Sequence, residues 1–207
     1  MADLVEEIPV AQAERQASRR WALAGVIGAA GGVGGVMFLD TGHSLATQEL
    51  RLRLCAAIGL AGVAGLLMFV AGLRSYLDAQ TPSGSLTSRV AQGGVLVTAV
   101  TLFTAYLAKL VTAGYTHGIT GQADVVVRNG LDELTSGAWA ALAVTMLAVA
   151  VAAVRYAALP RWLGWVSAVA GTAIGAATLA GAPQAGFLPG VAWLLVTSIL
   201  LARRRTT

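Results

Sequence analysis

The stretch from Trp162 to Ala202 contains no charged residue, and this feature constrains the fold more than any other. A helix that crosses about 30 Å of hydrocarbon needs about 20 apolar residues, so the stretch is about twice as long as one membrane-spanning helix requires. Pro183 and Pro189 lie near its middle among several glycines, which is typical of a turn. The stretch therefore predicts two membrane-spanning helices, over about 162–182 and 187–202.

Four further apolar segments precede this stretch, each bounded by a charged residue, and they predict helices over about 22–39, 54–73, 90–110 and 134–154. Only 12% of the residues are charged and 57% are hydrophobic, so a water-soluble fold of this length could not cover its apolar surface. Long unbroken apolar segments also exclude a membrane β-barrel, whose strands alternate. The expected fold class is all-α: an integral membrane bundle of about six transmembrane helices over 21–203, between a polar tail (1–20) and a basic tail (204–207).

The distribution of Lys and Arg predicts the orientation of this bundle. With the N-terminus inside, ten of the 14 basic residues fall on the inner side. The four on the outer side are Arg51, Arg53, Lys109 and Arg128. Basic residues concentrate on the cytoplasmic side of membrane proteins, so we expect both termini in the cytoplasm and the protein in the cell's inner (plasma) membrane.

Small residues at helical spacing form stripes on two of the predicted helices. The pairs are Gly28/Gly32 and Gly31/Gly35 on the first helix, with Ser167, Gly171 and Gly175 on the fifth. Such stripes let another backbone approach closely. They indicate packing within one bundle or, alternatively, a homo-oligomer interface.

Tryptophans near the ends of the predicted spans are interpreted as interface anchors, because an indole ring has one polar edge. Trp21, Trp162 and Trp165 fall near the inner boundary, and Trp139 falls near the outer one.

Lys109 is the one lysine of the chain and lies at the predicted outer end of the third helix. It either extends to the lipid headgroups or turns into the bundle towards a carboxylate. Its side of the membrane also carries His117 and three carboxylates, so the candidate catalytic or binding residues are Asp40, Lys109, His117, Asp132 and Glu133. We also expect a long outer loop over about 112–133, since long polar loops often carry function.

Several kinds of site are not expected. One cysteine and two histidines in no recognisable metal-binding spacing argue against a metal site, and we expect no cofactor. Cys55 is interpreted as a small packing residue. The basic residues flank apolar segments instead of clustering, so no nucleic acid is expected as a partner. The Pro82–Ser85 segment is interpreted as an ordinary polar turn.

The segment Leu159-Pro160-Arg161-Trp162-Leu163-Gly164-Trp165 resembles one found in uncharacterised bacterial multi-pass membrane proteins of actinobacterial type. The resemblance covers about 138–180 and includes a Gly-rich helix after the Pro-Arg-Trp turn. It implies a membrane fold and no particular activity.

Three functions remain open. The first is a membrane-embedded protein that handles a hydrophobic small molecule or lipid, by acid–base catalysis of a cyclase or isomerase kind, at a polar outer mouth. The second is an accessory or assembly subunit of a larger membrane complex. The third is a small transporter or channel, for which related halves and broken helices would be typical. The expected partners are membrane lipid, a hydrophobic small molecule, and a membrane protein or second copy.

Overall fold

The structure is a computed structural model that describes residues 21–33, 45–82, 85–115 and 122–203. The described residues are 93% helical and contain no strand, which confirms the all-α class. The helices are Trp21–Val33, α2 (Leu45–Gln80), α3 (Thr87–Tyr115), α4 (Gln122–Tyr156), α5 (Arg161–Leu179) and α6 (Phe187–Arg203), with a 3₁₀ helix, η1 (Pro183–Gly186), before α6. Five of these, α2 to α6, are long and apolar enough to span a membrane.

The helix Trp21–Val33 is apolar but shorter than the other five. The predicted span of 22–39 therefore matches it in part, and residues 34–39 lie outside the described residues. Helices α5 and α6 agree closely with the expected 162–182 and 187–202. Pro183 begins the turn as predicted, whereas Pro189 lies in the first turn of α6, where a missing N–H leaves no helical hydrogen bond unmade.

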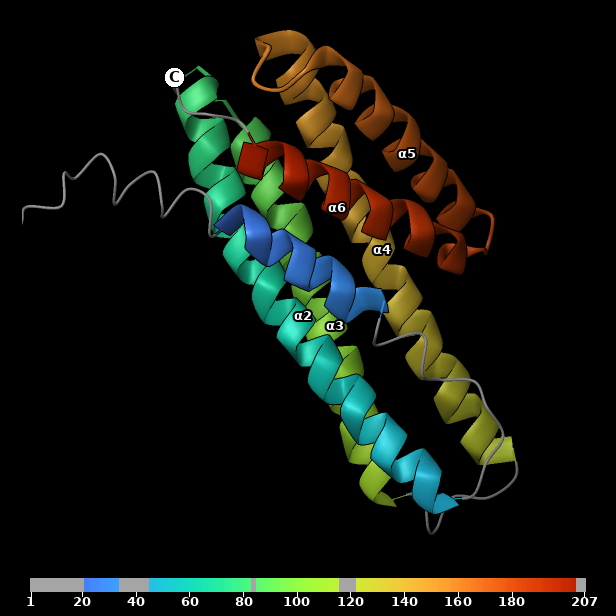
Figure 1. Ribbon diagram of the computed structural model, residues 1–207. Helices are drawn as coiled ribbons and strands as arrows, with labels where there is room; N and C mark the ends of the chain where they lie inside the picture. The colour runs from blue at the N-terminus through green and yellow to red at the C-terminus, as the bar shows by residue number, and fades with distance from the viewer. Residues whose placement is uncertain (1–20, 34–44, 83–84, 116–121, 204–207) are drawn as a thin grey trace, which may run out of the picture.

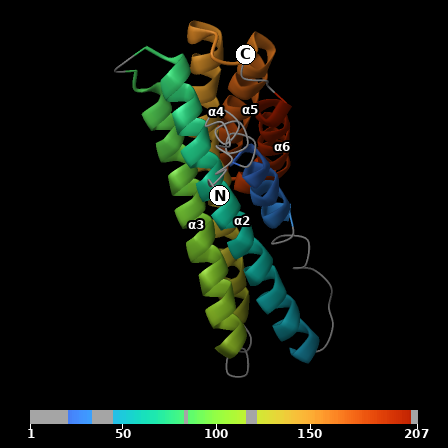
Figure 2. The same cartoon turned by 60° about the vertical axis from the view of Figure 1, so that its left-hand side comes forward.

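Helices α2, α3 and α4 extend well beyond the predicted spans. The prediction of a long outer loop over about 112–133 is wrong, because α3 continues to Tyr115 and α4 already begins at Gln122. A helix satisfies its own backbone hydrogen bonds in water as well as in lipid, so the end of an apolar segment does not end the helix. Figures 1 and 2 show α2, α3 and α4 continuing past the shorter helices at one end of the bundle.

The helix Trp21–Val33 packs against α2 through glycine. A Cβ added to Gly31 would lie 2.3 Å from the Cα of Gly62, and one added to Gly65 would lie 2.6 Å from the carbonyl oxygen of Ala24. The two backbones are therefore in direct contact, as small-residue stripes allow. Gly28 also faces Leu66 of α2, so the described glycines of the first stripe, Gly28, Gly31 and Gly32, pack within the bundle. Gly35 lies outside the described residues.

The second stripe also packs inside the molecule over most of its length. Ser167 and Gly171 are buried on α5, and Gly171 faces the backbone of Ala143 on α4. A Cβ added to Gly175, in contrast, would meet nothing within 4 Å.

Trp139 of α4 is a core residue, so its interpretation as an interface anchor is wrong. Its side chain is 2% exposed and contacts three glycines from three segments: Gly32, Gly186 and Gly190. The glycines leave a space that the large indole ring fills, and burial of that ring outweighs its preference for the interface. Trp162 and Trp165 are exposed, at 51% and 64%, as an anchoring role requires.

Candidate functional site around Lys109

Lys109 is buried in the bundle and does not extend to the headgroups. Its side chain is 3% exposed, although it lies two turns from the end of α3. Of the two directions that the sequence left open, the structure shows the inward one, and the headgroup alternative is wrong. The expected carboxylate within about 4 Å stays a prediction.

Tyr106 lies one turn before Lys109, and its ring packs on α2. A Cβ added to Gly59 would lie 2.5 Å from the Cζ atom of Tyr106, so the ring occupies the space that glycine leaves. The side chain is 1% exposed, and its hydroxyl makes no hydrogen bond within the part of the chain that the structure describes. A buried hydroxyl without a partner is costly, and such groups often belong to binding sites.

Cys55 completes this group from the α2 side. The residue is 1% exposed, lies one turn before Gly59, and is close enough to Lys109 and Tyr106 to interact with both electrostatically. We call Cys55, Tyr106 and Lys109 the Lys109 cluster. It joins α2 to α3 at the end of the bundle where the long helices continue past the short ones.

Of the other four predicted site residues, the structure describes the side chain of Glu133 alone. Asp40 and His117 lie outside the described residues. Asp132 belongs to α4, but its side chain is likewise outside the description. Glu133 is exposed on α4. The structure therefore brings Lys109 together with Tyr106 and Cys55, of which only Lys109 was predicted as a site residue.

The sequence offered a partial signal for the two residues that were missed. Tyr106 and Lys109 are three residues apart, a spacing that places both on one face of a helix. Nothing in the sequence pairs Cys55 with them, because that contact depends on how α2 and α3 are aligned.

The chemistry open to the Lys109 cluster follows from its three groups. An ammonium donates up to three hydrogen bonds, a phenol both donates and accepts, and a thiol does so weakly. Together they suit an oxygen-bearing head group on an otherwise apolar molecule. Among the described residues, no group of three or more His, Cys, Asp or Glu side chains is arranged to hold a metal ion.

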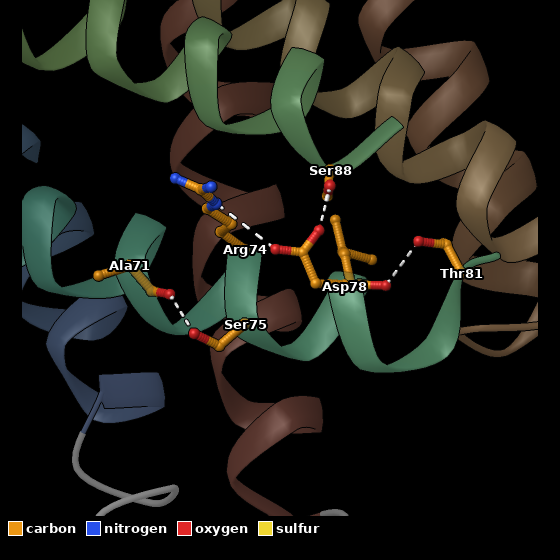
Figure 3. Close-up of polar contacts among 7 residues, drawn as sticks. Ala71, Arg74, Ser75, Asp78, Thr81 and Ser88 are labelled. Atoms are coloured by element: carbon orange, nitrogen blue, oxygen red, sulfur yellow. Dashed lines mark hydrogen bonds and ion pairs between the residues drawn. The ribbon is translucent and has the colours of Figure 1, made fainter. Parts of the chain in front are cut away.

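A second polar group lies at the opposite end of α2, where it turns into α3 (Figure 3). Arg74 pairs with Asp78 over 3.4 Å from Nε to Oδ2, and the Ser88 hydroxyl donates to the other oxygen of the same carboxylate. The Thr81 hydroxyl donates to the Leu77 carbonyl at 2.8 Å. These bonds fix the turn, so we assign this group a structural role, in line with the interpretation of Pro82–Ser85 as a polar turn.

A third polar group lies in the interior between α5 and α6. The Trp193 indole N–H donates to the Ser167 hydroxyl over 2.7 Å, and both side chains are buried. The hydroxyls of Thr197 and Ser198 are fully buried and make no hydrogen bond among the described residues. The indole–hydroxyl bond ties the two helices together.

No family model, curated protein or solved structure matches this chain. Of the three polar groups, the Lys109 cluster alone contains a buried cationic side chain.

Proposed function

We propose that this protein binds a hydrophobic small molecule or lipid within the membrane and holds its polar head at the Lys109 cluster. The observation that carries the proposal is the burial of Lys109, the one lysine in the chain, beside a buried tyrosine hydroxyl that has no partner among the described residues. Charged side chains within membrane helices are costly and mark functional sites. An apolar ligand would reach the cluster from the lipid, and an acceptor oxygen on its head would meet the two donors.

The catalytic form of this proposal is proton transfer to or from the bound head, with cyclase or isomerase chemistry as the reaction class. Lys109 and Tyr106 carry exchangeable protons and lie one turn apart on α3. Asp40, His117, Asp132 and Glu133 remain candidates for the opposite acid or base. We further propose that both termini lie in the cytoplasm and that the bundle resides in the inner (plasma) membrane.

The accessory-subunit alternative loses part of its motivation, because the first glycine stripe packs against α2 within the same chain. The transporter alternative has no specific support, since α2 to α6 run without a break through the described spans. Both remain outcomes of the following test.

The test is photo-crosslinking of the purified protein with diazirine-bearing palmitic acid, a probe with an apolar chain and an oxygen-bearing head. Wild-type protein should be labelled saturably, and unlabelled palmitic acid should compete. Lys109→Met should weaken labelling about tenfold, as loss of about 1.4 kcal/mol would, and Tyr106→Phe should weaken it less. The matched control, Arg89→Met, removes an exposed cation from the other end of α3 and should leave labelling unchanged.

Labelling that does not saturate, or that is equal in all four proteins, would contradict the binding proposal. A stoichiometric protein partner in the purified material would favour the subunit instead, and probe-independent ion flux in proteoliposomes would favour the transporter.

A further inference from the structure

The C-terminal third of the chain contains positive charge with no negative charge to balance it. From Leu134 to Thr207 there is no Asp or Glu, while this region holds five arginines: Arg155, Arg161, Arg203, Arg204 and Arg205. Any counterion for these arginines must therefore come from another part of the chain or from outside it.

Two of the arginines flank the turn between α4 and α5. Arg155 lies in the last turn of α4 and Arg161 is the first residue of α5, and both are exposed. Among the described residues, neither forms an ion pair. They lie six positions apart in the sequence, at the two ends of a short connection.

The connection that carries them is held firmly. The Ala158 N–H donates to the Ala152 carbonyl over 3.2 Å, and the Tyr76 hydroxyl of α2 donates to the Ala158 carbonyl over 2.8 Å. Ala158 and Leu159 are buried, at 1% and 2% exposed. A turn fixed in this way places the backbone of both arginines without the ordering cost of a flexible loop.

The nearby carboxylate at this end is already engaged. Asp78 lies two residues after Tyr76, and it accepts from both Arg74 and Ser88. Trp162, next to Arg161, is exposed, as is Trp165, and exposed tryptophans concentrate at headgroup depth. The Arg155 guanidinium lies over the Tyr156 ring, 5.9 Å from its centroid, but neither arginine has a carboxylate partner among the described residues. These arginines and the anchoring indoles therefore share one end of the bundle.

We propose that Arg155 and Arg161 form a binding site for the head group of an anionic phospholipid. A guanidinium binds phosphate oxygens through two parallel hydrogen bonds, and two such groups around one turn suit a single phosphodiester with its net negative charge. The site lies at the opposite end of the bundle from Lys109 and does not depend on the function proposed for that cluster.

The experiment titrates delipidated protein in detergent with phosphatidylglycerol or phosphatidylcholine of identical acyl chains and counts bound lipids by native mass spectrometry. Phosphatidylglycerol should bind wild type more tightly than phosphatidylcholine does. Each arginine near a membrane surface contributes about fivefold to anionic-lipid binding, so Arg155→Gln/Arg161→Gln should weaken phosphatidylglycerol binding about 25-fold. Phosphatidylcholine binding should weaken much less, because the choline cation offsets the charge of its phosphate.

The matched control is Arg53→Gln/Arg89→Gln, which removes the same charge from exposed positions outside the turn, Arg89 at the same end of the bundle and Arg53 near the start of α2. This double variant should weaken phosphatidylglycerol binding by less than about threefold, because it changes only the general electrostatic field of the protein. Equal binding of the two lipids to wild type, or equal losses in the two double variants, would overturn the proposal.

A third variant addresses the carboxylates of the N-terminal tail, another source of negative charge in the chain. If these pair with the arginines, phosphatidylglycerol should bind wild type weakly and bind Glu6→Gln/Glu7→Gln/Glu14→Gln far more tightly. That result would also overturn the lipid site, whereas unchanged tight binding would support it.

Discussion

Replacement of Gly31 by alanine tests the contact between the helix Trp21–Val33 and α2 more sharply than any other single change. The added Cβ would lie 2.3 Å from the Cα and 2.7 Å from the backbone nitrogen of Gly62. Both atoms belong to backbone, so neither can rotate away and the two helices must separate. Forcing extra atoms into a packed interface costs about 1–3 kcal/mol, and the absence of a movable side chain places this case near the upper value.

The intrinsic preference of a helix for alanine opposes this cost. Gly→Ala inside a helix gains about 1 kcal/mol, so the net destabilisation of Gly31→Ala should be about 2 kcal/mol. For a protein of this size, 1 kcal/mol shifts the melting temperature by about 2–4 °C, which predicts a fall of about 4–8 °C. The melting temperature is measured by thermal unfolding in detergent, with tryptophan fluorescence as the signal.

Gly93→Ala is the matched control. Gly93 lies inside α3, and a Cβ added there would meet nothing within 4 Å. Only the helix preference then acts, so its melting temperature should rise by about 2–4 °C. The reasoning is refuted if both variants shift in the same direction, or if Gly31→Ala melts at the wild-type temperature.

Three further changes have expected outcomes in the same unfolding assay. Ala157 has a φ of 52°, in the left-handed region, so Ala157→Gly should stabilise the fold by about 1 kcal/mol; a lower melting temperature would be inconsistent with that backbone strain. Ser167→Ala leaves the buried indole N–H of Trp193 without an acceptor and should cost about 1–3 kcal/mol, whereas the same change in a Trp193→Phe background should cost less than about 1 kcal/mol; equal costs in the two backgrounds would argue against the hydrogen bond. Asp78→Asn removes the charge partner of Arg74 at a half-exposed position and should cost less than about 1 kcal/mol; a loss of several kcal/mol would mean that this carboxylate does more than fix the turn.

The sequence predicted the fold best where local chemistry ends a helix. Pro160 precedes α5, and Gly181, with a φ of 80°, follows it, so both ends of that helix could be placed to within a few residues. The start of α4 was misplaced because its first turns, near Val125, lie outside the apolar segment while remaining helical. Hydropathy detects the lipid-facing part of a helix and not its full length.

Of the candidate site, Lys109 could be picked out from the sequence, but its neighbours could not. Lys109 is conspicuous as one charge at the end of an apolar helix, but the sequence left open whether its side chain extends to the headgroups or turns into the bundle. Its proximity to Cys55 and the packing of the Tyr106 ring against Gly59 depend on the alignment of α2 against α3. That alignment is a property of the packed pair, and neither helix specifies it alone.

Mapping where the photoreactive palmitic acid attaches tests the central claim, that the Lys109 cluster receives the head of an apolar ligand. Digestion and mass spectrometry of the labelled wild-type protein should place the competable adducts on α2 and α3, within a turn or two of Cys55 and Tyr106, and Lys109→Met should remove them. Competable adducts confined to the exposed faces of α5 and α6, and unaffected by Lys109→Met, would contradict the claim.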